Sequence, residues 1–62
     1  MKTTIEQQKH YLTETATRLF NEGNSTDAVV KALKNTINNL DFSKEINVDA
    51  IQYLVKQNLG LI

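Results

Sequence analysis

The chain contains no cysteine and a single histidine among its 62 residues. It therefore has no disulfide, and it lacks the Cys/His clusters that hold structural zinc. A domain of this length buries only about 60% of the surface that its unfolded chain exposes, so its core is marginal. Small domains commonly gain stability from a disulfide, a metal or an oligomer. Of these, self-association is the simplest that remains for this chain, and the alternative is a very well packed monomer.

Neither sign of charge is in excess, because seven Lys and Arg residues balance seven Asp and Glu residues. Nucleic-acid-binding proteins typically carry a basic excess, since phosphate neutralisation supplies much of their affinity. Neutrality therefore lowers the expectation of DNA binding, although it does not exclude a DNA-binding dimer. No run of about 18 apolar residues predicts a membrane span, and residues 1–4 lack the apolar segment of a signal peptide. We expect a cytoplasmic protein with no membrane contact.

Proline is absent and glycine occurs only twice, which suits regular helices. Apolar residues recur with the helical period in three segments. This pattern predicts an all-α protein, a compact three-helix domain over residues 1–62 with helices at about 4–22, 25–40 and 47–59. Gly23 and Gly60 are predicted to end the first and third helices, because glycine adopts the left-handed conformation there without a steric penalty.

Polar residues that can cap a helix precede each predicted segment. Thr4 and Gln7 have the spacing of a capping box, either Asn24 or Ser25 can cap the second helix, and Asn47 can cap the third. Phe42, between the second and third helices, is expected to fold back onto the core. The predicted core consists of Ile5, Leu12, Ala16, Leu19, Phe20, Val29, Val30, Leu33, Ile37, Leu40, Val48, Ile51, Val55 and Leu59.

No pattern of residues indicates catalysis or metal binding. Glu6, His10 and Glu14 are spaced i, i+4 and i+8, as metal ligands on one helix face could be. That face lies opposite the apolar stripe, so we interpret it as solvated, with Glu14 paired to Arg18 one turn later. The chain has no glycine-rich phosphate loop, and Ser25 is better explained as a cap than as a nucleophile. We expect no enzyme, no metal and no cofactor.

Residues 19–33 resemble a helix-turn-helix motif, with a short glycine-containing turn between two helices. The resemblance implies that the second helix enters the major groove of DNA, as part of a dimeric regulator. The residues chemically suited to phosphate or base contacts are Ser25, Thr26, Lys31, Lys34, Asn35 and Asn38. The segment departs from the pattern at Leu19, where a small residue is usual, and at Glu22, where an apolar residue is usual.

The last fifteen residues carry the strongest functional signal, because nine of them are apolar. Their apolar arc is roughly twice the width that a core-facing stripe needs. Once the core stripe is assigned, the surplus consists of Ala50, Tyr53, Leu54 and Ile62.

This surplus predicts a surface for a protein partner or for a second copy of the chain in a homodimer. The protein would then be a small regulator or inhibitor, of the kind carried by phages and plasmids. An antitoxin-like module is a weaker reading, because its usual basic or disordered tail is missing. The competing interpretation is that the third helix is purely core, covered on two sides by the other helices.

Overall fold

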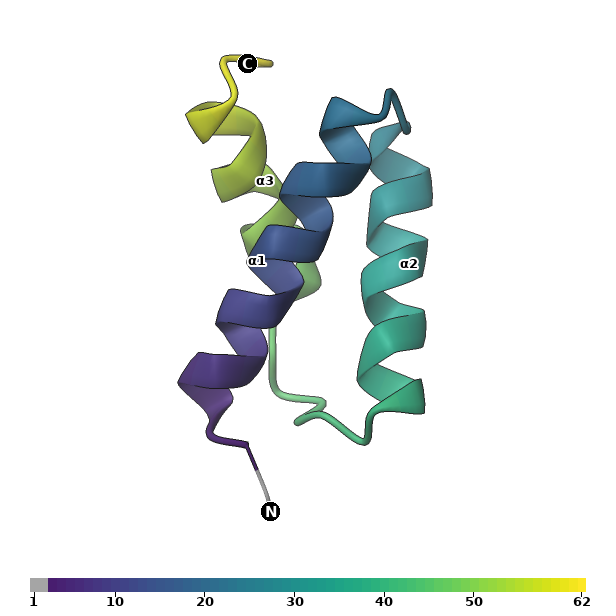
Figure 1. Cartoon of the computed structure of the whole chain (residues 1–62), viewed down its shortest axis with the longest axis vertical. Helices are drawn as coiled ribbons and strands as arrows, with labels where there is room; N and C mark the ends of the chain where they lie inside the picture. Colours follow the sequence, from purple (N-terminus) through teal and green to yellow (C-terminus); the bar gives the residue numbers. More distant parts are fainter. Residues whose placement is uncertain (1–2) are drawn as a thin grey trace.

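A computed structural model describes residues 3–62 and contains, in that range, three helices and no strand. The helices are α1 (Ile5–Asn21), α2 (Thr26–Asn39) and α3 (Val48–Asn58) (Figure 1). The predicted all-α class and three-helix architecture are confirmed. Each predicted range is one residue longer at both ends, because it included the cap residues.

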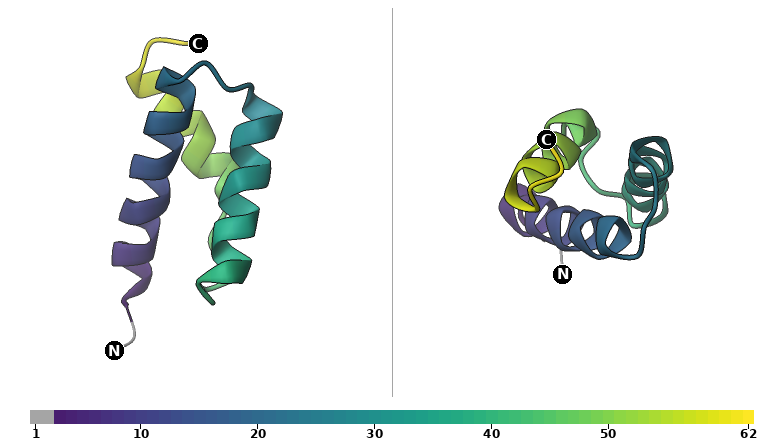
Figure 2. Two further views of the ribbon diagram at one scale, coloured as in Figure 1. Left: turned by 45° about the vertical axis from the view of Figure 1, so that its right-hand side comes forward. Right: turned by 90° about the horizontal axis from the view of Figure 1, so that it is seen from above.

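The three helices run up, down and up along the long axis of the molecule (Figure 1). α1 and α2 form an antiparallel hairpin, and α3 returns alongside α1. Every helix contacts both of the others, and from above they occupy the corners of a triangle (Figure 2). None of the helices in residues 3–62 is long and apolar enough to cross a membrane.

The predicted N-terminal caps are all present. The Thr4 hydroxyl accepts from the Gln7 amide at 3.1 Å, and the Gln7 side chain accepts from the Thr4 amide at 2.9 Å, which completes the capping box. The Ser25 hydroxyl accepts from the Ala28 amide at 3.2 Å. The Asn47 side chain accepts from two amides of the first turn of α3. These bonds satisfy donors that a helix start leaves unpaired.

Both glycines end a helix as predicted. Gly23 and Gly60 have φ angles of 94° and 73°. After α3, the Gly60 amide donates to the Gln57 carbonyl at 3.1 Å and the Leu61 amide donates to the Lys56 carbonyl at 2.9 Å. This pair of bonds is a Schellman ending, which needs a left-handed residue at the glycine position.

The core lies where the three apolar faces meet. Its buried residues are Leu12, Ala16, Val29, Leu33, Ile37, Ile46, Val48, Ile51 and Val55, with Leu19, Phe20, Val30, Phe42 and Leu59 partly buried against them. Phe42 folds back as expected, and its ring meets Tyr11 edge-on at 5.9 Å between centroids.

Two residues predicted for the core are instead exposed. Ile5 is 45% exposed and Leu40 is 50% exposed. Ile5 is the first residue of α1, and Leu40 is the C-cap of α2. Asp41 follows with a φ of 55° and turns the chain away. The apolar stripes therefore extend beyond the part of each helix that its neighbours cover.

One polar residue, Gln8, lies in the core region although it was not among the residues predicted for the core. It is 9% exposed. Its side-chain oxygen Oε1 accepts a hydrogen bond from the backbone amide of Ser43 at 3.0 Å. Its amide nitrogen donates to the Thr3 carbonyl and hydroxyl oxygens at 3.2 and 3.1 Å. Gln8 thus connects the α2–α3 joint to the chain before α1. Its position on the stripe between Ile5 and Leu12 was the signal that could have identified it.

Candidate protein-interaction surface on α3

α3 turns one side to the core and the opposite side to solvent. Its buried residues are Val48, Ile51 and Val55, which are 6%, 9% and 1% exposed. Successive helix residues are about 100° apart, so the positions opposite these three form a second face. We call this the outward face of α3, and it consists of the exposed residues Ala50, Tyr53, Leu54 and Gln57.

None of the four residues of the outward face is charged, and two of them, Tyr53 and Leu54, are large and apolar. Tyr53 is 53% exposed and Leu54 is 51% exposed, and Ala50 lies between them in helical projection. From Ala50 to the end of the chain, Lys56 is the only charged side chain. Its ammonium donates to the Thr26 hydroxyl at 3.1 Å, which directs it toward the start of α2. The four residues of the outward face are themselves uncharged, and the exposed Asp49 borders the face one turn before Tyr53.

Ile62 lies beyond this face rather than on it. It is 59% exposed, and the chain has left the helix at Gly60 before reaching it. The C-terminus lies at the same end of the molecule as the α1–α2 joint (Figure 2). The structure thus brings together Ala50, Tyr53 and Leu54, and places Ile62 with Leu61 past the end of α3.

Exposed apolar side chains concentrate in this part of the molecule. Seven large apolar side chains are exposed in the described residues, and four of them lie between residues 53 and 62. The other three, Ile5, Tyr11 and Leu40, belong to α1 and to the end of α2. Single exposed apolar residues are ordinary on a protein surface, whereas a cluster marks an interaction site or a liability.

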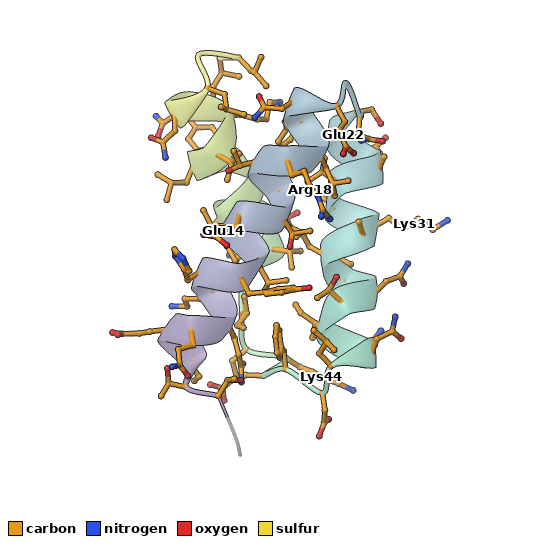
Figure 3. All side chains as sticks on the ribbon, viewed as in Figure 1. Glu14, Arg18, Glu22, Lys31 and Lys44 are labelled. Carbon is orange, nitrogen blue, oxygen red and sulfur yellow. The ribbon has the colours of Figure 1, made fainter. Side chains whose placement is uncertain are left out.

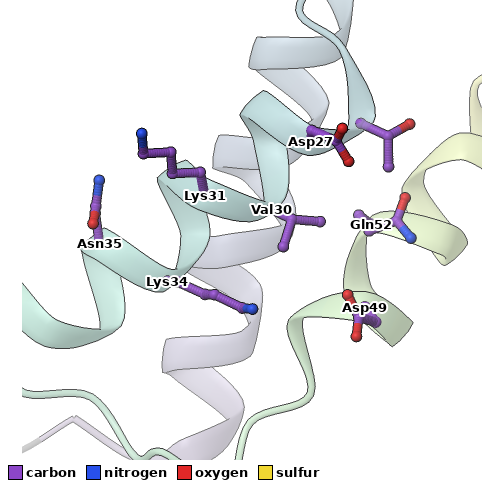
Figure 4. A pocket seen from close by; sticks show the side chains of 8 residues that line it. Asp27, Val30, Lys31, Lys34, Asn35, Asp49 and Gln52 are labelled. Atoms are coloured by element: carbon purple, nitrogen blue, oxygen red, sulfur yellow. The ribbon is translucent and has the colours of Figure 1, made fainter.

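The residues of the DNA-binding alternative do not form one basic surface. Thr26, Lys31, Lys34 and Asn35 line a groove of about 500 Å³ between α2 and α3, but Asp27 and Asp49 line it too. Figure 4 shows Lys34 extending toward α3, whereas Lys31 and Asn35 point away from it. Carboxylates on both walls oppose the approach of a phosphate to the lysine between them.

The remaining two DNA-binding candidates lie elsewhere. Ser25 uses its hydroxyl to cap α2, and Asn38 lines a separate hollow of about 280 Å³ with Lys34 and Lys44. Figure 3 shows Lys31 and Lys44 on different parts of the molecule. The groove is also lined by Gln52, which was not among the predicted site residues. The side-chain oxygen Oε1 of Gln52 is buried without a hydrogen-bond partner in the described residues.

The acidic row on α1 is solvent-exposed. His10 Nε2 lies 3.0 Å from Glu14 Oε1, with the two side chains 74% and 69% exposed. The prediction of an ion pair between Glu14 and Arg18 is wrong. Glu14 pairs with His10 instead and extends away from Arg18 (Figure 3). Within residues 3–62, no group of three or more His, Cys, Asp or Glu residues could hold a metal ion.

Comparisons of the chain with protein-family models, curated proteins and solved structures found no match. The class that the fold defines is an all-α three-helix protein. Its function is therefore inferred from its own surfaces.

Proposed function

We propose that this chain is a small non-enzymatic interaction protein, which binds a protein partner through the outward face of α3. The observation that carries the proposal is the exposed, uncharged set of Ala50, Tyr53 and Leu54 on one side of a helix whose other side is buried. The cores of protein interfaces are depleted of charge and enriched in aromatic residues. Tyrosine suits such a site, because it offers an apolar body and a polar tip.

Burial of the two large side chains on the outward face supplies part of the energy of a contact. Full burial of a large apolar side chain contributes about 1.5–3 kcal/mol. About half of Tyr53 and of Leu54 remains exposed, so covering each contributes on the order of 1 kcal/mol. The two anchors together contribute about 2 kcal/mol, so the contacts around them must supply the rest of the roughly 8 kcal/mol that a micromolar affinity needs.

The fold also prepares the surface for binding. α3 is capped at both ends and packed against α1 and α2, so a partner need not order it. Preorganisation of this kind lowers the entropic cost of association. The binding mode is a helix laid against a helix or into a groove of the partner. Covering a partner's surface in this way is the action of a regulator or inhibitor. We place it in the cytoplasm, because small secreted domains are commonly rich in disulfides.

The DNA-binding regulator takes second place. The turn that it requires is formed, since Gly23 has a φ of 94° and Ser25 caps α2. However, the groove beside Lys34 contains both Asp27 and Asp49. Because carboxylates border it, α2 is poorly suited to contact the phosphates of DNA. The α3 surface therefore supports a protein partner better than α2 supports DNA.

Substitution on the outward face tests the proposal. The immobilised chain is exposed to lysate of its host, the retained protein is identified by mass spectrometry, and its purified form is titrated calorimetrically. Leu54→Asp should weaken binding at least tenfold, which corresponds to about 1.4 kcal/mol, because it buries a charge in an uncharged contact. Circular dichroism checks that the variant keeps its helices.

The matched control is Leu40→Asp. Leu40 is 50% exposed, close to the 51% of Leu54, but it caps α2 at the end of the molecule away from the C-terminus (Figure 1). This variant should bind as the wild type does. Equal loss in both variants, or a wild-type chain that neither retains a protein nor self-associates, would contradict the proposed function.

A further inference from the structure

We draw no further inference here: the strongest candidate, the outward face of α3 with the exposed Asp49 at its border, belongs to the interaction surface already described, and nothing in the structure shows which partner covers it.

Discussion

At the scale of single residues, Gln8 connects parts of the chain that are 35 positions apart. Its carbonyl oxygen accepts from the Ser43 amide while its amide nitrogen donates to Thr3. Gln8→Ala leaves the partly buried Ser43 donor without its acceptor. An unsatisfied buried donor costs about 1–3 kcal/mol, so the free energy of unfolding should fall by that amount. Urea unfolding followed by circular dichroism measures it.

Two variants separate this effect from a general loss of helix stability. Gln7→Ala removes a side chain that is exposed and bonds only to Thr4, so it should cost less than Gln8→Ala. Gln8→Glu keeps an acceptor for Ser43 but, when ionised, offers no donor to Thr3, so it should fall between wild type and Gln8→Ala. A Gln8→Ala variant no less stable than Gln7→Ala would show that the hydrogen bonds of the Gln8 side chain contribute little to the free energy of unfolding.

At the scale of the helices, Gly60 ends α3 in the left-handed region, with a φ of 73°. A methyl group added there meets no atom within 4 Å, so the cost of Gly60→Ala is conformational rather than steric. The left-handed conformation costs an L-residue about 1–2 kcal/mol. For a domain of this size, 1 kcal/mol lowers the Tm by about 4–8 °C.

A thermal melt checks this prediction, with Gly60→Asn as the matched variant. Asparagine tolerates the left-handed conformation better than alanine, so its Tm should lie between those of wild type and Gly60→Ala. An alanine variant that melts with or above the asparagine variant would mean that the last turn of α3 unwinds at little cost.

The helix ends were predictable from the sequence because their causes are local. Thr4, Ser25 and Asn47 each lie within three residues of the amide that they cap, and Gly23 and Gly60 act on the adjacent turn. The exposure of Leu40 was not predictable in this way. Leu40 continues the apolar period of α2, but the period does not encode where neighbouring helices stop covering it.

At the scale of the whole molecule, the site was predictable only as far as the helical period reaches, because the period does not encode which residues the neighbouring helices cover. Periodicity separated Val48, Ile51 and Val55 from Ala50, Tyr53 and Leu54, and the structure buries the first set and exposes the second. Ile62 was grouped with the second set on its apolarity alone. Its place depends on the chain reversal at Gly60, which removes it from the helical register. Whether α3 was central or peripheral depended on how α1 and α2 pack, which one helix's pattern does not contain.

The small size of the core makes the molecule sensitive to a single cavity. Leu33 is 0% exposed at the centre of α2, and replacing a buried leucine by alanine costs about 3–5 kcal/mol. A single core below about 70 residues rarely supplies more than 3–5 kcal/mol in total. Leu33→Ala should therefore be largely unfolded at 25 °C, whereas Leu40→Ala, at a residue 50% exposed, should remain folded. Far-UV circular dichroism distinguishes the two. If Leu33→Ala stays folded at high protein concentration and unfolds on dilution, the missing stability comes from self-association, because association stabilises the folded chain by mass action.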